Sequence, residues 1–195
     1  MTGKAPSPTD PLSHLGRLSR AGQPGAADSS AATGPNTNIC GDFDIRIGRD
    51  GTWFYHGSPI GRKPLVRLFA SVLRREGDDY LLVTPVERGR IVVDDVPFTA
   101  VELDAVGSGP DQRLEFRTNL DDRVVAGPGH AIRVTHDADT AEPTPYIEVR
   151  DRLDARIVRS VYYQLVELGQ ERRIDGEDVF GVWSSGQFFS LGRLG

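Results

Sequence analysis

The residues best able to recognise a ligand lie close together between positions 53 and 67. They are Trp53, Tyr55, His56, Arg62, Lys63 and Arg67. Aromatic rings stack on flat molecules such as bases, and guanidinium and ammonium groups pair with phosphate or carboxylate oxygens. These residue types therefore predict a binding site for an anion, in which the aromatic side chains hold a flat ring beside it.

The basic residues of this cluster stand where a helix is expected to begin. Pro64 suits the first turn of a helix, where its missing N–H group would have no partner. Arg62 and Lys63 then lie beside the positive end of the helix dipole, and no Ser, Thr, Asp or Asn occupies the adjacent cap position. A bound anion would satisfy the free N–H groups, the dipole and both side chains together. Alternatively, both side chains point to water or pair with carboxylates such as Asp78 or Asp79.

Several of the candidate residues also have a purely structural interpretation. His56 can donate a proton or contact a ligand, or it can satisfy a local hydrogen bond. Trp53 can be a stacking platform or an anchor of the core. Asp121 and Asp122 can act as an acid and a base, or remain solvated in a turn. Arg67, one helical turn beyond the start, can complete an anion clamp or stay in water.

The overall composition excludes several classes of function. The chain has 195 residues, a formal net charge of -5 and a sequence pI near 5.4, which argues against bulk binding to nucleic acid or to anionic membranes. Its four histidines show none of the spacings of a zinc site, and the single cysteine, Cys40, offers no thiolate cluster. No phosphate-binding loop, dinucleotide fingerprint or nucleophile elbow is present in the sequence. We therefore predict no metal and no cofactor.

Two further observations predict where the protein works. No apolar run reaches the roughly 20 residues that a membrane-spanning helix needs, and no apolar segment follows a basic start at the N-terminus. A single cysteine cannot form a disulfide within the chain. We expect a cytoplasmic protein without a membrane span.

The elements that must hold the cluster follow from hydrophobic spacing. Residues 1–38, rich in Gly, Pro, Ser and Ala, predict a disordered tail. Apolar and polar residues alternate from Phe43, and Asp50-Gly51 is typical of a tight hairpin turn before a strand over residues 52–56. A helix is expected next. Its apolar stripe is Leu65, Leu68, Phe69, Val72 and Leu73, with Arg74 and Arg75 in its last turn and Gly77 at its end.

The rest of the chain predicts a meandering antiparallel sheet and a second helix. Short strands are expected over residues 80–86, 90–94, 98–103, 113–119, 123–126, 131–134, 146–149, 179–183 and 188–191. The second helix is expected from about Leu153 to Leu168. Asp151 and Asp154 would cap its start and complement its dipole, so that the free N–H groups of this helix would need no bound anion.

A comparison of the two halves of the sequence indicates a repeat. An offset of 93 positions aligns Trp53 with Tyr146 and Phe69 with Tyr162 without a gap. Strand, turn, helix and strand recur in the same order, which predicts a duplicated unit, although hydrophobic pattern alone can produce such a match. The expected fold class is α+β, with two related subdomains, residues 39–104 and 105–195. Each would be an antiparallel sheet with one packed helix.

Several motifs in order resemble an uncharacterised bacterial family, domain of unknown function 1285. The longest covers residues 40–87 and reads CGDFDIRIGRDGTWFYHGSPIGRKPLVRLFASVLRREGDDYLLVTPVE. The others read VDDVPF, FRTNLDD, PYIEVRDRL, VYYQLVELG and GVWSSGQFFSLG. The resemblance covers about residues 39–195.

This resemblance implies more than the residues do alone. It implies a repeated motif, a C-terminal half superficially similar to pleckstrin-homology folds, and a site at the interface of the halves for a nucleotide-like molecule. It also implies a link to signal transduction. In this sequence the interface falls on residues 53–67 and on Arg150 opposite them.

The leading hypothesis is therefore a non-enzymatic protein that binds an anionic, nucleotide-like small molecule between two related subdomains. Arg62 and Lys63 would contact phosphate, supported by Arg67 and Arg150. One alternative is an enzyme that acts on a phosphorylated metabolite, with a histidine or carboxylate as general acid or base. Another is a module that binds a protein partner. The oligomeric state stays open.

Overall fold

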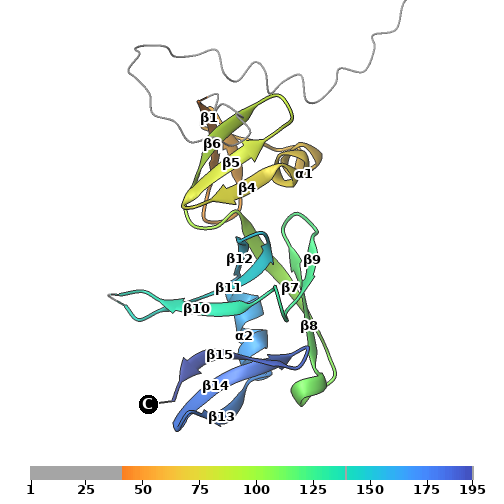
Figure 1. The fold of residues 1–195 in the computed structure, drawn as a ribbon, viewed down its shortest axis with the longest axis vertical. Coiled ribbons are helices and arrows are strands. Elements are labelled where there is room, and N and C mark those ends of the chain that lie inside the picture. The colour runs from red at the N-terminus through yellow and green to blue at the C-terminus, as the bar shows by residue number, and fades with distance from the viewer. Residues whose placement is uncertain (1–40, 139, 195) are drawn as a thin grey trace, which may run out of the picture.

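The computed structural model describes residues 41–138 and 140–194, which form three sheets and two helices (Figure 1). The predicted tail over residues 1–38 lies outside these residues. The N-terminal sheet, at one end of the molecule, has the strand order β3-β2-β1-β6-β5-β4. Its strands are β1 (Asp42–Ile47), β2 (Trp53–Tyr55), β3 (Ser58–Pro59), β4 (Leu73–Glu76), β5 (Asp79–Val83) and β6 (Arg88–Val93). Helix α1 (Lys63–Ser71) connects β3 to β4.

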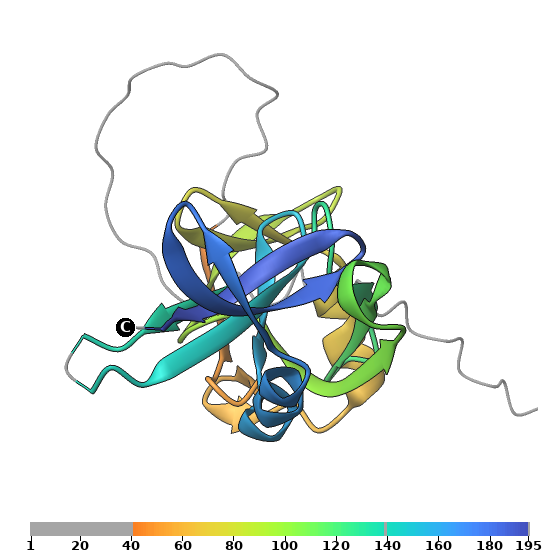
Figure 2. The ribbon, with the colours of Figure 1, turned by 90° about the horizontal axis from the view of Figure 1, so that it is seen from below.

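The C-terminal half contains a second six-stranded sheet and a smaller one. The C-terminal sheet has the order β10-β11-β12-β7-β8-β9, and the three-stranded sheet has the order β13-β14-β15. The strands of the first are β7 (Phe98–Val106), β8 (Arg113–Thr118), β9 (Arg123–Val125), β10 (Ile132–His136), β11 (Pro143–Arg150) and β12 (Leu153–Ile157). Those of the second are β13 (Gln170–Ile174), β14 (Glu177–Ser184) and β15 (Gln187–Arg193). A short 3-10 turn, η2 (Gly109–Asp111), joins β7 to β8, and helix α2 (Arg159–Glu167) packs against β7 and β14 (Figure 2).

Both six-stranded sheets have the same organisation. Each consists of two antiparallel meanders of three strands, joined at the centre of the sheet by one parallel pair. The pair is β1 with β6 in the N-terminal sheet and β12 with β7 in the C-terminal sheet. A purely antiparallel meander was predicted, and these central pairs correct it. The spacing of the strands could not show them, because a parallel pair joins segments that are distant in sequence.

The hairpin that opens the fold is confirmed. Strands β1 and β2 pair in antiparallel fashion with Ile47 opposite Trp53. The connection between them contains Gly51, which has a φ of +80° and so takes the left-handed conformation that a tight turn requires. The inward residues Phe43, Ile45 and Ile47 are all buried, as their alternation predicts.

The first helix ends earlier than its apolar stripe suggests. Helix α1 stops at Ser71, and the next residues form β4, which pairs with β5. Arg74 and Arg75 therefore lie on a strand and not in the last turn of a helix. Gly77, with a φ of +59°, belongs to the β4–β5 turn. A glycine with positive φ ends a helix and turns a hairpin equally well, so the sequence signal was ambiguous here.

The second helix also begins later than predicted. Residues from Leu153 to Ile157 form β12, a central strand, and α2 runs only from Arg159 to Glu167. Asp151, with a φ of +45°, lies in the turn before β12. Asp154 is 8% exposed and receives a hydrogen bond of 2.6 Å from Arg133. The prediction that these two aspartates cap the helix is therefore wrong. Val158 is the N-cap residue, and no acidic residue lies in the first turn.

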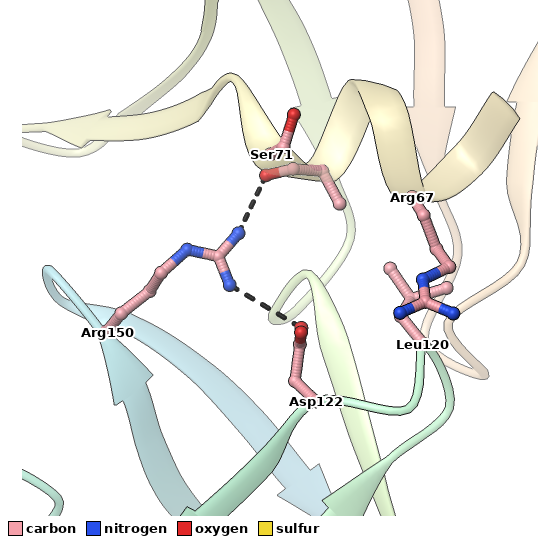
Figure 3. A pocket seen from close by; sticks show the side chains of 6 residues that line it. Arg67, Ser71, Leu120, Asp122 and Arg150 are labelled. Atoms are coloured by element: carbon pink, nitrogen blue, oxygen red, sulfur yellow. Dashed lines mark hydrogen bonds and ion pairs between the residues drawn. The ribbon is translucent and has the colours of Figure 1, made fainter. Parts of the chain in front are cut away.

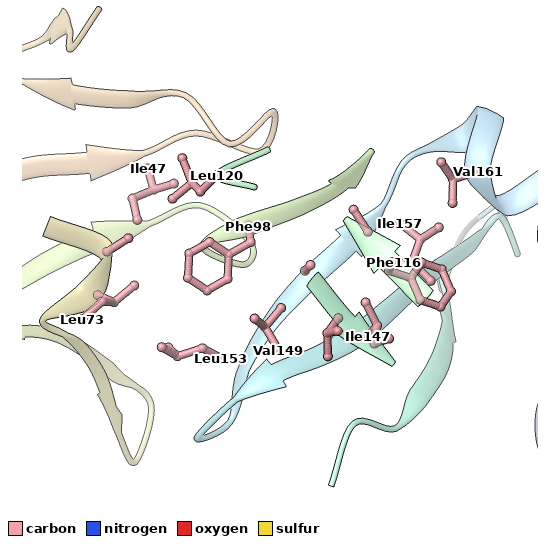
Figure 4. Close-up of a cluster of buried hydrophobic side chains, with 14 of the residues drawn as sticks. Ile47, Leu73, Phe98, Phe116, Leu120, Ile147, Val149, Leu153, Ile157 and Val161 are labelled. Carbon is pink, nitrogen blue, oxygen red and sulfur yellow. The ribbon is translucent and has the colours of Figure 1, made fainter. Parts of the chain in front are cut away.

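One hydrophobic core extends through both halves (Figure 4). Phe98, at the start of β7, is fully buried, and Figure 4 shows it near Leu73 of β4, Leu120 and Leu153 of β12. Burial of such side chains contributes about 1.5–3 kcal/mol each. Apolar side chains thus pack the two halves against each other.

The described residues were searched for a membrane-spanning helix and for a metal-binding group. No helix there is long and apolar enough to cross a membrane. Among residues 41–138 and 140–194, no group of three or more His, Cys, Asp and Glu side chains is placed to hold a metal ion.

Candidate functional site

A cavity of about 370 Å³ lies between helix α1 of the N-terminal half and the C-terminal sheet (Figure 3). The described residues that line it are Arg67, Ala70, Ser71, Leu120, Asp122 and Arg150. The first three come from α1, Leu120 and Asp122 come from the β8–β9 turn, and Arg150 ends β11. The volume is within the range of about 300–1,000 Å³ that is usual for small-molecule sites.

Arg150 crosses from the C-terminal sheet to the helix of the other half. Its Nη2 donates a hydrogen bond of 2.7 Å to the carbonyl oxygen of Ala70, and its Nη1 lies 3.5 Å from Oδ2 of Asp122. The guanidinium carbon also lies 5.2 Å from the centre of the Phe98 ring, which favours the charge through a cation–π contact. These three contacts hold a cation at the wall of the cavity, where the side chain stays about one-third exposed. Figure 3 shows the hydrogen bond and the ion pair.

Asp121, in the same β8–β9 turn, forms ion pairs with three cations. Its Oδ2 lies 2.8 Å from Nζ of Lys63 and 3.5 Å from Nη1 of Arg67, and its Oδ1 lies 3.2 Å from Nη1 of Arg117. The hydrogen bond from Lys63 is the main reason why the pKa of Asp121 is lower than usual, and the charges of all three cations act in the same direction. Asp121 has a φ of +67°, an uncommon backbone conformation for a residue other than glycine.

The start of α1 has the features that the sequence predicted. Arg62 is the N-cap residue, no side chain in the described chain caps the helix, and no acidic residue lies in its first turn. Lys63 does pair with a carboxylate, but its partner is Asp121 and not Asp78 or Asp79. The carbonyl oxygen of Arg62 accepts backbone hydrogen bonds from Leu65 and Val66, but its side chain makes no hydrogen bond or ion pair with the residues that the structure describes. It is exposed and lies at the edge of the cluster.

The three aromatic candidates lie away from this cavity. Trp53 is 2% exposed and its ring is stacked 6.3 Å from that of Phe69, so the indole supports α1 from within the core. No described residue accepts a hydrogen bond from its Nε1. Tyr55 and His56 have their ring centroids 4.1 Å apart, and the His56 Nδ1 lies 2.6 Å from Oδ2 of Asp44 on β1.

The structure therefore divides the predicted cluster into two parts. Lys63, Arg67 and Arg150 come together around one cavity and its β8–β9 turn, whereas Trp53, Tyr55 and His56 do not line it. From the sequence, Asp121 and Asp122 were interpreted either as an acid and a base or as solvated carboxylates of a turn. This interpretation missed their role as ionic partners of the basic cluster. The signal that was available is the pair of adjacent carboxylates in a turn, but nothing in the sequence connects that turn with α1.

Two models of protein families match the chain, one in each half. The model of the DUF1285 N-terminal domain, a domain of unknown function, matches residues 35–96. The model of the DUF1285 C-terminal domain, a protein of unknown function, matches residues 97–191. None of the curated proteins searched matches the chain at a significant level.

Two crystal structures are similar to this chain. A DUF1285 family protein from Silicibacter pomeroyi DSS-3 is 44% identical, with 96% of this chain and 97% of that chain covered and a TM-score of 0.77. A DUF1285 family protein from Shewanella baltica OS155 is 26% identical, with 64% of this chain and 91% of that chain covered and a TM-score of 0.51.

Proposed function

The chain belongs to the DUF1285 family, and we propose that it binds a small anionic, nucleotide-like molecule in the cavity between its two halves. One observation carries the proposal: Arg67 from α1 and Arg150 from β11 converge on the same cavity from opposite halves. Arginine is well suited to phosphate because its planar fork of N–H donors matches two phosphate oxygens at once.

The ionic partners of these arginines support the same chemistry. Oδ2 of Asp122 pairs with Arg150, and Oδ2 of Asp121 pairs with Lys63 and Arg67. Carboxylate oxygens thus occupy positions at which the oxygens of a phosphate would be accepted. A ligand would displace one carboxylate from its cations and take its place, with Arg62 at the uncapped start of α1 as a further cation.

We also propose that the cavity lies between two subdomains that arose by duplication. The order of three strands, helix and three strands around α1 recurs around α2, from β10 to β15. The two units differ in one respect, since β1 and β6 pair within one sheet, whereas β10 and β15 contact each other from different sheets. On the basis of the family resemblance, we further propose that the C-terminal half is similar to pleckstrin-homology folds and that the protein is a cytoplasmic component of signal transduction. The single cysteine in 195 residues supports a reducing compartment.

A thermal-shift screen of the purified protein against nucleotides and phosphorylated metabolites tests the proposal. A ligand at 100 times its dissociation constant adds about 2.7 kcal/mol of stability, which corresponds to an increase in Tm of about 5–10 °C for a chain of this size. The variant Arg67→Ala should lose most of this shift, because Arg67 lines the cavity and its side chain is 53% exposed.

Arg113→Ala is the matched control. Arg113 is 62% exposed, lies on β8 and has a single ion pair, at 3.6 Å from Glu115, away from the cavity. The control should keep the full shift. A screen without any shift, or a shift that Arg67→Ala leaves intact, would remove this cavity as the ligand site.

A further inference from the structure

A second cavity, of about 600 Å³, lies on a different part of the molecule. It is bounded by the tip of the β1–β2 hairpin, by the beginning of β11, by the end of β12 and by the first turns of α2. It shares no lining residue with the cavity beside α1. Its chemistry is also different, because no aromatic ring is among the described residues that line the first cavity.

One part of the wall of this second cavity is apolar. Pro143 and Pro145 face it from β11, and the rings of Tyr162 and Tyr163 face it from α2. Tyr163 is 55% exposed, an unusually large exposure for an aromatic ring. Burial raises the pKa of the Tyr162 hydroxyl, which makes no side-chain hydrogen bond with the described chain. Proline and tyrosine rings offer flat apolar surfaces, and such surfaces favour a planar ligand.

The rim of the same cavity carries more positive than negative charge. Arg49, Arg156 and Arg159 face Asp50 and Glu142. This surplus lies on a protein whose formal net charge is -5. The carboxylate of Asp50 is turned back onto its own hairpin, where it accepts hydrogen bonds from the backbone N–H and the hydroxyl of Thr52 at 3.0 and 2.8 Å.

Two of the three arginines are available to a ligand. The side chain of Arg49 makes no hydrogen bond or ion pair within residues 41–138 and 140–194, and its charge is near enough to Asp94 to help lower the pKa of that carboxyl. Arg159 is 77% exposed and reaches Glu142 only at 4.0 Å. Its Nε donates a hydrogen bond of 2.9 Å to the hydroxyl of Tyr163, which holds the guanidinium beside the aromatic wall. Arg156 is more fully engaged, since it pairs with Asp95 at 3.6 Å.

We propose that this second cavity binds a planar organic acid. The flat body of the ligand lies between the tyrosine rings of α2 and the two prolines of β11. Its acid group meets Arg49 and Arg159 at the rim. Guanidinium groups bind carboxylate and sulfonate oxygens through charge-assisted hydrogen bonds.

Isothermal titration calorimetry of the full chain with 2-naphthoate, a planar carboxylate, tests the proposal. Two analogues separate the parts of the recognition. 2-Naphthalenemethanol keeps the ring and lacks the charge, whereas adamantane-1-carboxylate keeps the charge and lacks the flat shape. We expect 2-naphthoate to bind with one-to-one stoichiometry and each analogue to bind at least tenfold more weakly. Absence of 2-naphthoate binding at millimolar concentration, or equal affinity for the three compounds, would overturn the proposal.

Substitutions test whether 2-naphthoate binds in this second cavity. The double variant Arg49→Ala, Arg159→Ala should weaken 2-naphthoate binding at least tenfold, and Tyr162→Leu, which keeps an apolar side chain, should weaken it about threefold to tenfold. Arg113→Ala, on an exposed part of β8, should bind as the unmodified chain does. Far-ultraviolet circular dichroism of each variant verifies that it is folded. Unchanged affinity in the folded double variant would show that the acid binds elsewhere and would refute the assignment.

Discussion

The guanidinium of Arg150 donates a hydrogen bond of 2.7 Å to the carbonyl oxygen of Ala70, which lies 80 positions earlier in the chain. Two further hydrogen bonds connect the two halves nearby, between the β4–β5 hairpin and the β11–β12 turn. Arg152 donates to the carbonyl oxygen of Gly77 at 3.3 Å, and Arg75 donates to that of Arg152 at 3.4 Å. Arginine side chains thus fix the end of α1 and the β4–β5 hairpin against the β11–β12 turn.

Loss of the Arg150 side chain should weaken the contact between the halves. Arg150→Ala leaves the carbonyl of Ala70 without this donor and Asp122 without its cation. Hydrogen bonds to charged groups contribute about 1.5–3 kcal/mol, so we expect the free energy of unfolding to fall by about 1–3 kcal/mol in urea titrations. Arg150→Lys should recover part of it, since the charge returns without the planar fork. A loss within 0.5 kcal/mol would contradict the bridging role.

Removal of the charge of Asp121 should strengthen anion binding at the cavity beside α1. In Asp121→Asn, Lys63 and Arg67 lose the carboxylate that now occupies them. We expect the affinity for inorganic phosphate, measured by calorimetry at low ionic strength, to rise about threefold to tenfold. Glu115→Gln removes a carboxylate that pairs with other arginines, Arg113 and Arg123, and serves as the matched control. A weaker affinity in Asp121→Asn would mean that Asp121 positions the cations.

The low pKa of Asp121 predicts a pH dependence of stability. The folded chain binds this proton more weakly than the unfolded chain, whose carboxyl has a pKa of about 3.9. The stabilisation is therefore present above about pH 4 and is lost as the pH falls through the lower pKa of the folded state. In Lys63→Met the pKa should move upward, because the hydrogen bond from Lys63 is its main cause.

Carbon-13 NMR titration of the Asp121 carboxyl in both proteins measures this shift directly. Arg67 and Arg117 remain in the variant and should keep part of the lowering. A titration curve of Asp121 that is the same in both proteins would show that Lys63 does not govern its pKa.

A pair of glycines in the three-stranded sheet tests its packing. A Cβ at Gly181 on β14 would lie 2.3 Å from the carbonyl oxygen of Phe189 and 2.8 Å from the ring of Phe188. Overpacking of this kind costs about 1–3 kcal/mol, so Gly181→Ala should lower Tm by about 2–12 °C. At Gly192, on β15, an added Cβ would meet no atom of the described chain within 4 Å. Gly192→Ala should therefore leave Tm nearly unchanged, and equal effects of both substitutions would be inconsistent with this packing.

The sequence allowed the prediction of elements whose turns are chemically distinctive. Asp50-Gly51 indicated the first hairpin, and the alternation from Phe43 indicated which side chains are buried. The end of α1 was misplaced because Gly77 fits a helix end and a hairpin turn alike. Strand β12 was interpreted as helix because its residues are buried on both faces, which removes the alternation that identifies a strand.

The candidate site was predictable only in its local part. The uncapped basic start of α1 depends on neighbouring residues, and the sequence showed it. The pairing of Lys63 with Asp121 depends on the packing of two sheets that are far apart in sequence, and no periodicity encodes such a contact. For the same reason, the separation of Tyr55 and His56 from Arg67 was not foreseen, although all three lie within one short stretch.

The central parallel pairs have a consequence for the order in which the chain acquires its structure. The N-terminal sheet can close once β6 has been synthesised, since Arg46 then finds its partner Val92. The C-terminal sheet has to wait for β12, because Phe98 pairs with Ala155. One edge of β7 therefore stays unpaired until β12 has been synthesised. Arg150 reaches Ala70 only after β11 has been synthesised, so the cavity beside α1 is completed well after the N-terminal sheet.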